Sequence, residues 1–182
     1  MKETSILHHT VDGAEILPID EEQLKYQASI IKQKSIKSVV LIGIYSPSNP
    51  AQEIAAEKFL KSELGPGYII SCSYAIGRLG FLERENASIL NASLRRFAGH
   101  VIAGFYHAVN LLNLKRCELY ITLNDGTLSK AKDAAELPVR CFSSGPTNSA
   151  TGAALLAMPT IEEFKKRNPS DEKEILVIDV GG

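Results

Sequence analysis

The feature that most constrains the fold is a strand, a helix and a second strand that follow one another directly. The residues from 37 or 38 to 45 are β-rich and almost wholly apolar, which predicts a central strand covered on both faces. Prolines 47 and 50 end that strand. Residues 51–64 then have helical spacing, and Gly65-Pro66-Gly67 ends the predicted helix. Residues 68–73 predict another strand. Such a βαβ unit has parallel strands and a right-handed crossover. The fold class is therefore α/β.

A hairpin and a helix precede this unit, and a long helix follows it. Before it, residues 6–19 predict a small hairpin around the Asp12-Gly13 turn, and Asp20 is a suitable N-cap for a helix over residues 21–34. After it, residues 86–113 predict one long helix with an apolar stripe that we expect to be its buried face. The stripe consists of Leu90, Leu94, Phe97, Val101, Phe105, Ala108 and Leu112.

The rest of the chain is predicted to alternate short strands and helices. We expect strands at residues 118–123, 139–142 and 175–178, and helices at residues 130–136 and 152–157. Asn124-Asp125-Gly126 is typical of a tight turn. Residues 143–149 are small or polar and predict a loop, and residues 160–173 predict a polar linker.

Composition and charge limit the classes of partner. The 182 residues include 20 basic and 21 acidic ones, mixed along the sequence, for a formal net charge of −1. This balance supports neither nucleic-acid nor membrane binding. The cysteines at 72, 117 and 141 are odd in number and far apart, which favours reduced thiols. The sequence shows no secretory signal and no apolar run near the ~18 residues of a membrane span, so we expect a soluble cytoplasmic protein.

Two segments that follow predicted strands are candidate ligand sites. The serine-rich segment at residues 143–149 lies before a helix, where free N–H groups and the helix dipole favour phosphate or carboxylate. The alternative is an ordinary loop capped by Asn148 or Ser149. Asn124-Asp125-Gly126 also follows a strand and is predicted to face the same crevice, although such a turn is more often structural.

Two acidic motifs complete the candidates. Glu83, Arg84 and Glu85 place a basic residue between two acids at the start of the long helix, either to position a substrate or as a solvated helix start. The final Asp179-Val180-Gly181-Gly182 follows an apolar run. It predicts either a metal-binding carboxylate with a glycine-rich phosphate loop, or a strand that ends in a flexible glycine tail.

In their order and spacing, these segments resemble the hydantoinase A/5-oxoprolinase (hydantoinase/oxoprolinase) family. Residues 80–94 resemble its Glu-Arg…Leu-Asn-Ala stretch, and residues 124–128 resemble its Asp-Gly-Gly-Leu turn. Pro138-Val139-Arg140, then Ser144-Gly145-Pro146 and Gly152-Ala153, resemble its Pro-Val-Arg…Ser-Gly-Pro…Gly-Ala run. Residues 178–182 resemble the start of its Asp-Val-Gly-Gly-Thr loop.

The resemblance implies a partial actin-like ATPase (ribonuclease H-like) architecture. Residues 1–79 would be the C-terminal part of the family's N-terminal domain, and residues 80–182 the start of its hydantoinase A/oxoprolinase domain. It also implies ATP- and Mg²⁺-dependent opening of a cyclic amide such as a hydantoin or 5-oxoproline. Phosphorylation would turn a poor leaving oxygen into phosphate, and Mg²⁺ would offset the phosphate charge.

The resemblance also implies roles for particular residues, none of them assigned as catalytic. Asp179, Gly181 and Gly182 would belong to a phosphate loop, with Asp179 as the metal ligand. Cleft residues beside that loop would be Ser144, Gly145, Pro146 and Asn148, with Asn124, Asp125 and Gly126 nearby.

The departures from the family pattern change the expected activity. Family members carry an additional Asp-x-Gly-Gly-Thr-type loop upstream and continue well beyond the second one, and many have Ala-Gly-Gly where this chain has Thr147-Asn148-Ser149. We therefore expect a fragment of an ATP-dependent cyclic-amide hydrolase that is inactive alone, so whether it is itself an enzyme stays open. The alternatives are a non-catalytic remnant that acts as an interaction or regulatory subunit, through self-association or a partner subunit, and a small anion-binding module.

Overall fold

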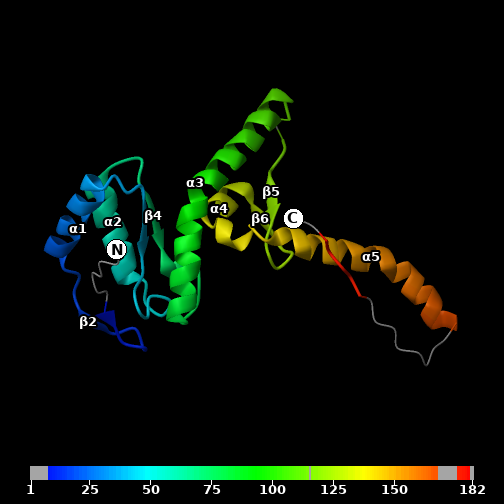
Figure 1. Cartoon of the computed structure of the whole chain (residues 1–182), viewed down its shortest axis with the longest axis horizontal. Coiled ribbons are helices and arrows are strands. Elements are labelled where there is room, and N and C mark those ends of the chain that lie inside the picture. Colours follow the sequence, from blue (N-terminus) through cyan, green and yellow to red (C-terminus); the bar gives the residue numbers. More distant parts are fainter. Residues whose placement is uncertain (1–7, 115, 168–175, 181–182) are drawn as a thin grey trace.

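The computed structural model describes residues 8–114, 116–167 and 176–180, and its first half is the predicted βαβ unit (Figure 1). Strands β3 (Ser38–Leu41) and β4 (Ile69–Cys72) pair in parallel, from Ser38 opposite Ile69 to Leu41 opposite Cys72. Helix α2 (Ala51–Leu64) connects them and stops at Gly65, whose φ of 77° suits glycine. Both predicted helix boundaries are confirmed.

The hairpin and first helix also form as predicted. Strands β1 (His8–His9) and β2 (Glu15–Leu17) are antiparallel, and α1 (Glu21–Gln33) starts where the Asp20 carboxylate accepts the N–H of Gln23 at 3.0 Å. Helices α1 and α2 pack together over one face of the β3–β4 sheet. The core between them consists of Leu24, Ala28, Leu41, Ala56, Leu60, Leu64, Ile70 and Cys72.

The prediction that β3 is a central strand is wrong for the part of the chain that the structure describes. There β3 pairs with β4 alone, in a two-stranded sheet, and it ends at Leu41 rather than at residue 45. The strand stops early because the N–H and the carbonyl of Gly43 bind the side chains of Glu53 and Arg84. A backbone that bonds to side chains in this way cannot continue a β-ladder.

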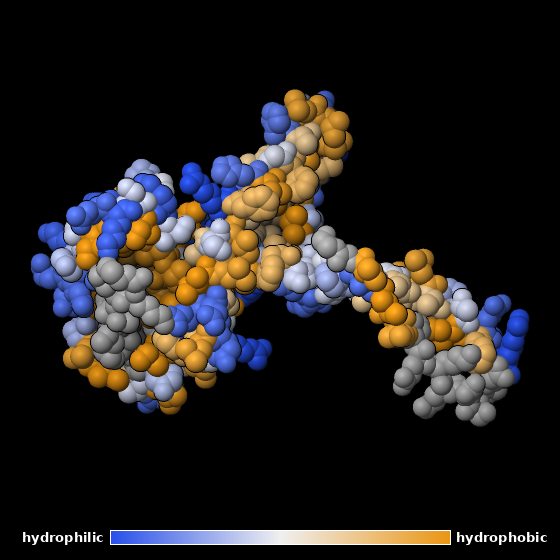
Figure 2. Space-filling model, in the orientation of Figure 1, coloured by the Kyte–Doolittle hydropathy of each residue, from blue (hydrophilic) through white to orange (hydrophobic). Residues whose placement is uncertain are grey.

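The long helix α3 (Phe81–Leu111) begins five residues before the predicted start, and its buried face is not the predicted one. Its buried residues are Arg84, Ser88, Asn91, Ala92 and Ile102, which face the sheet and the second half of the chain. The apolar stripe exists but faces outward over much of its length, with Phe97 70% and Leu112 70% exposed. Figure 2 shows apolar residues on the projecting end of this helix.

The second half of the chain is a small unit on the flank of α3. Strands β5 (Tyr120–Thr122) and β6 (Leu128–Lys130) form a hairpin around the predicted Asn124-Asp125-Gly126 turn, followed by α4 (Ala131–Glu136). The predicted strand at residues 139–142 is wrong. The chain instead forms the 3-10 turn η2 (Pro138–Arg140), because the Cys141 and Phe142 N–H groups both bond to the Pro138 carbonyl, at 3.0 Å each.

The final helix, α5 (Ser144–Arg167), contains the predicted helix at 152–157, extends it over the predicted loop and linker, and projects from the body of the molecule (Figure 1). The predicted loop at 143–149 is helical from Ser144. The predicted linker at 160–173 is helical as far as Arg167, and its residues 168–173 lie outside the described residues. Pro146 fits because a helix tolerates proline in its first turn. The predicted strand at 175–178 is wrong for residues 176–178, which form no strand, and residue 175 lies outside the described residues.

In the described part of the chain, none of the helices combines the length and the apolar character that crossing a lipid bilayer would require.

Candidate functional site

Asn124 joins the turn after β5 to the start of α5. Its side-chain amide donates to the carbonyl of Val139 at 2.9 Å, and its Oδ1 accepts the N–H of Ser143 at 2.9 Å. Its N–H donates to the carbonyl of Arg140 at 2.7 Å, and its carbonyl accepts the hydroxyl of Thr147 at 2.7 Å. The structure therefore brings together the two segments that the sequence analysis singled out, through bonds on both the backbone and the side chain of one residue.

Asp125 lies at the exposed tip of the same turn. Its Oδ1 accepts the hydroxyl of Thr127 at 2.6 Å and the Thr127 N–H at 3.0 Å. These two bonds lower the pKa of the Asp125 carboxyl, with a smaller contribution from the charge of Arg140. Gly126 has a φ of 83°, and a Cβ there would lie 3.3 Å from the methyl carbon of Thr147. The turn thus holds an ionised carboxylate close to α5.

A cavity of about 350 Å³ opens beside this turn. Asn124, Asp125 and Arg140 provide its polar lining, and Ile76, Ala87, Leu123 and Val139 complete it. Arg140 also donates to the carbonyl of Ala75, at 2.8 Å, in the 3-10 turn η1 (Ser73–Ala75) that follows β4. One cation and one carboxylate therefore line the same small cavity, which lies between the two halves of the chain.

The start of α5 offers an anion fewer donors than a serine-rich loop would. The N–H of Ser143 binds Asn124, the N–H of Ser144 binds the carbonyl of Cys141 at 3.2 Å, and Pro146 has no N–H. Of the predicted cleft residues, Ser144 is half-buried, whereas Gly145, Pro146 and Asn148 are exposed in the first turns of the helix. The predicted loop cap by Asn148 or Ser149 is wrong, because both residues lie inside α5.

The predicted metal ligand, Asp179, does not line this cavity. It is exposed in the segment 176–180. Gly181 and Gly182 lie outside the described residues. Within the described ranges, no group of three or more His, Cys, Asp or Glu side chains is placed to hold a metal ion. A Mg²⁺ site usually combines carboxylates with phosphate oxygens, and the described residues do not fit one on their own.

A buried polar cluster lies at the carboxyl ends of β3 and β4. The Glu53 carboxylate accepts the N–H of Gly43 at 2.7 Å, the hydroxyl of Ser73 at 2.6 Å and the N–H of Tyr74 at 3.1 Å. Arg84 donates from Nε to the Ser73 hydroxyl at 3.0 Å. Because Glu53 and Arg84 are each 1% exposed, Ser73 connects two buried charges.

The two terminal nitrogens of the Arg84 guanidinium donate to backbone carbonyls. It donates to Arg78 at 2.8 Å, to Leu79 at 3.2 Å, to Ile44 at 2.8 Å and also to Gly43. All five N–H donors of the side chain thus have a partner. The prediction of a solvated helix start at residues 83–85 is therefore wrong for Arg84, and its full set of partners leaves it no donor for a substrate. It fixes the loops after β3 and β4 to α3.

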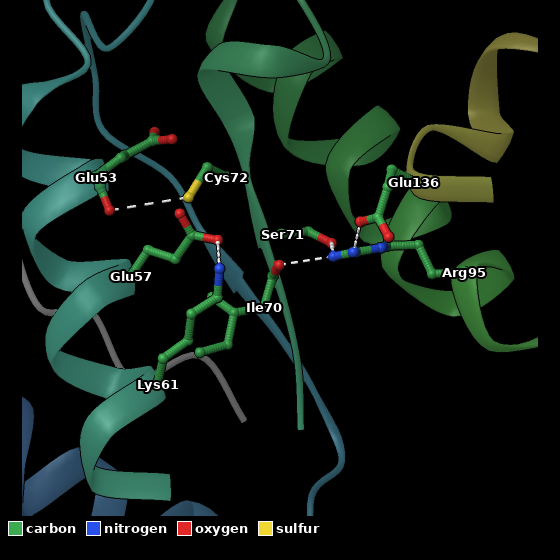
Figure 3. A network of polar contacts seen from close by, with 8 residues as sticks. All are labelled: Glu53, Glu57, Lys61, Ile70, Ser71, Cys72, Arg95 and Glu136. Carbon is green, nitrogen blue, oxygen red and sulfur yellow. Dashed lines mark hydrogen bonds and ion pairs between the residues drawn. The ribbon is translucent and has the colours of Figure 1, made fainter. Parts of the chain in front are cut away.

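A second set of polar contacts surrounds β4 (Figure 3). On one side, Arg95 of α3 donates to the carbonyl of Ile70 at 2.7 Å and pairs with Glu136 of α4. On the side of α2, the Cys72 thiol donates weakly to the carbonyl of Glu53 at 3.8 Å. Burial, with smaller contributions from nearby carboxylates, raises the pKa of Cys72 to about 12. This thiol is therefore protonated at neutral pH and does not act as a nucleophile.

The sequence analysis missed the buried polar residues of α2 and α3, although their helical spacing could have identified them. Glu53 precedes the apolar residues Ala56, Leu60 and Leu64 of α2 by intervals that place it on their buried face. Arg84, Ser88, Asn91 and Arg95 recur at intervals of four, three and four residues along α3. Such a stripe of polar residues predicts that α3 could bury its polar face instead of its apolar stripe.

Several known proteins are similar to this chain. A family model described as the hydantoinase/oxoprolinase N-terminal region matches residues 7–64. The acetophenone carboxylase gamma subunit of Aromatoleum aromaticum is 23% identical over 93% of this chain and 22% of its own length. The caprolactamase subunit alpha of Pseudomonas jessenii is 22% identical over 81% of this chain and 21% of its own. An uncharacterized protein of Methanocaldococcus jannaschii is 28% identical over 79% of this chain and 21% of its own.

Two solved structures share the fold. The nucleotide-free structure of an ATP-dependent acetone carboxylase superposes with a TM-score of 0.67, and the ATP-dependent caprolactamase from Pseudomonas jessenii with 0.69. Each is 17% identical and covers 84% of this chain and 22% of the solved chain. The chain thus spans about a fifth of the length of its curated relatives. The resemblance drawn from the sequence motifs is confirmed.

Proposed function

We propose, from the premise that this chain is a relative of the hydantoinase/oxoprolinase family, that it forms one wall of the substrate site of an ATP-dependent enzyme that opens a cyclic amide. The observation that carries this proposal is the cavity beside Asn124, with Asp125 and Arg140 in its lining. We also propose that a domain boundary lies between residues 79 and 80, that the fold is part of an actin-like ATPase architecture, and that the protein is cytoplasmic.

The chemistry of the cavity suits an amide. A ring amide carries a carbonyl oxygen, which accepts hydrogen bonds, next to an N–H group, which donates one. Arg140 is a donor that is always charged, and the lowered pKa of Asp125 keeps it an acceptor at neutral pH. The volume of about 350 Å³ lies in the range of small-molecule sites. Asn124 keeps this turn in place through its bonds to Ser143 and Thr147.

ATP, when bound, would supply the phosphoryl group that converts the amide oxygen into a better leaving group. The described residues do not complete a nucleotide and Mg²⁺ site, since no group of three or more His, Cys, Asp or Glu side chains among them could hold a metal ion, and the N–H groups of Ser143 and Ser144 are already bonded. In this proposal the chain binds and orients the amide, and the nucleotide is held with the help of other polypeptide. The isolated chain should therefore show no ATP turnover.

A nuclear magnetic resonance titration with hydantoin tests the proposal on the isolated chain. We expect the amide signals of Gly126 and of the Arg140 region to shift with added hydantoin, while those of Gly65 and Gly67, which lie after α2 on the first unit, stay fixed. Asp125→Asn should weaken these shifts, because the amide N–H loses its charged acceptor. Unshifted signals at Gly126 up to the solubility of hydantoin would refute the site. Steady ATP turnover that Asp179→Ala abolishes would refute the expected inactivity.

A second candidate function is that of a non-catalytic interaction or regulatory subunit, the alternative that the sequence analysis left open. The exposed apolar stripe of α3 favours it. This candidate predicts a stable association without any hydantoin-dependent change at Gly126, so the same titration separates the two.

A further inference from the structure

Gln52 is a buried polar side chain of α2 that lacks one hydrogen bond. It is 4% exposed, and its Nε2 donates to a carboxylate oxygen of Glu15 at 2.7 Å and to the carbonyl of Leu17 at 2.6 Å. Because both partners are acceptors, the nitrogen has to face them, and the orientation of the amide is fixed. Its Oε1 is shielded from water and, among the described residues, has no donor. A buried acceptor of this kind retains the full cost of its lost hydration, which a donor group from a ligand would offset.

Gln52 belongs to the wall of a cavity in the first half of the chain. The cavity has a volume of about 400 Å³, within the range of small-molecule sites, and it is formed by β2, α1, α2 and the loops beside them (Figure 1). The other polar residues of its lining are Glu15, Glu21 and Asn49. The Asn49 side chain already donates to one backbone carbonyl at 2.8 Å and accepts one backbone N–H at 3.0 Å. The cavity therefore offers a ligand the oxygen of Gln52 and two carboxylates.

The charge of the lining selects against an anion. The described residues that form it include two carboxylates and no lysine, arginine or histidine. Glu21 and Ala51, the first residues of α1 and α2, both line the cavity, and each helix N-terminus is equivalent to about half a positive charge. Glu15 and Glu21 each contribute a full negative charge, so the balance is negative by about one charge. A ligand with a positive charge is therefore favoured.

The rest of the lining suits an alkyl group. It consists of Ala51 and of the larger or more buried apolar residues Pro18, Ile19, Leu24, Ala55 and Phe59. A primary alkyl ammonium matches the whole cavity, because it has three N–H donors, no acceptor and an apolar chain. A divalent metal ion matches it less well. Ca²⁺ takes about six to eight oxygen ligands, and only three side chains here have an oxygen to offer.

We propose that this cavity binds a small primary alkylamine. Gln52 Oε1 and the carboxylates of Glu15 and Glu21 accept the three N–H groups of the ammonium, and the alkyl chain lies against the apolar wall that includes Leu24 and Phe59. The site shares no lining residue with the cavity beside Asn124. Binding of an amine here does not depend on the cyclic-amide function.

A nuclear magnetic resonance titration of the whole chain with n-pentylamine at pH 7 tests the site. We expect the side-chain amide signals of Gln52 to shift, because the oxygen of that amide becomes an acceptor. The neutral analogue n-pentanol has the same alkyl chain and should bind at least about tenfold more weakly, since its single hydroxyl donor carries no charge. Calcium chloride at the same ionic strength should leave the Gln52 signals unchanged.

Two matched pairs of variants locate the binding site. Glu21→Gln should weaken pentylamine binding about three- to fivefold, the effect of losing an exposed ion pair. Glu22→Gln, in the same turn of α1 but outside the lining, should leave the affinity unchanged. Ala55→Phe should abolish binding because the ring fills the cavity, whereas Ile54→Phe, at the neighbouring position of α2, should not. All four native side chains are exposed, so these changes should preserve the fold, which thermal melts check.

Each of four results would overturn the proposal. The first is the absence of any Gln52 shift at the highest soluble concentration of pentylamine, and the second is equal binding of pentylamine and pentanol. The third is an equal effect of the two variants within either matched pair. The fourth is saturable binding of Ca²⁺, or of a short peptide with one lysine, at least tenfold tighter than that of pentylamine, which would assign the cavity to a metal ion or to a polypeptide partner.

Discussion

Replacement of Glu53 by glutamine measures how much the buried cluster contributes to stability. The change keeps the shape of the side chain and removes its charge. Three donors face the carboxylate: Gly43 N–H, the Ser73 hydroxyl and Tyr74 N–H. In the best orientation, the glutamine carbonyl keeps the first two bonds in a weaker, uncharged form. Its NH₂ group then faces the N–H of Tyr74, so that one donor is left without an acceptor.

The expected cost follows from these three contacts. Two bonds that change from charged to neutral lose about 1 kcal/mol each, and one unsatisfied buried donor costs about 1–3 kcal/mol. The free energy of unfolding should therefore fall by roughly 3–5 kcal/mol, a large part of the ~5–15 kcal/mol typical of a domain. For a chain of this size, about 2–4 °C per kcal/mol gives a decrease in Tm of roughly 6–20 °C.

Glu57→Gln is the matched control for this experiment. Glu57 lies one turn further along α2 and pairs with Lys61 at 2.7 Å, as an i, i+4 pair whose lysine is 61% exposed. Such a pair contributes about 0.3–0.5 kcal/mol, so its loss should lower Tm by about 2 °C at most. Urea unfolding of the three proteins gives the comparison. The account of the cluster would be wrong if the two variants were equally stable.

Two further predictions follow from the pKa shifts. Cys117 is exposed and should react with a thiol reagent at pH 8, whereas Cys72, buried and with a pKa raised to about 12, should react only on unfolding. Since the folded pKa of Cys72 exceeds the ordinary thiol pKa of 9.0, its contribution to stability should be full below pH 9 and should fall as pH rises toward 12. Asp125 should titrate below 3.8, so its contribution to stability is present above that pH and is lost as pH falls through its folded pKa. Thr127→Val should return the titration observed by nuclear magnetic resonance toward 3.8, and an unchanged titration would contradict the assigned cause.

Local signals in the sequence predicted the first half of the fold well. The end of α2 at Gly65 and the start of α1 at Asp20 depend on residues within one turn of the boundary, which a sequence displays directly. The parallel β3–β4 pair follows from the helical connection between the strands. The hairpin turn at Asn124-Asp125-Gly126 was found for the same reason, because its left-handed glycine and its Asx bond are local.

Contacts between distant residues explain what the sequence analysis got wrong. The start of α5 resembles a loop in its composition, yet Asn124 binds it from 19 residues away through the N–H of Ser143. Strand β3 ends early because of Glu53 and Arg84, of which the second lies 41 residues from Gly43. On α3, periodicity identified the apolar stripe correctly, but it carries no information about which stripe the rest of the chain covers. The contact between the turn at 124–126 and the segment 143–149 was predictable as a meeting of two segments. The cavity was not, because none of residues 143–149 lines it and Arg140 does.

The contact between Arg95 and β4 has a consequence for aggregation. Ile69 donates its N–H to the carbonyl of Lys37 at 2.8 Å, so the next residue, Ile70, turns its carbonyl toward the edge of the sheet that β3 does not occupy. An open edge of this kind invites another strand to pair with it, which is how amyloid-like assemblies grow. The guanidinium of Arg95 occupies that carbonyl, and its pairing with Glu136 keeps it there. The Arg95 guanidinium therefore covers one of the carbonyls through which a foreign strand would pair with the open edge of β4.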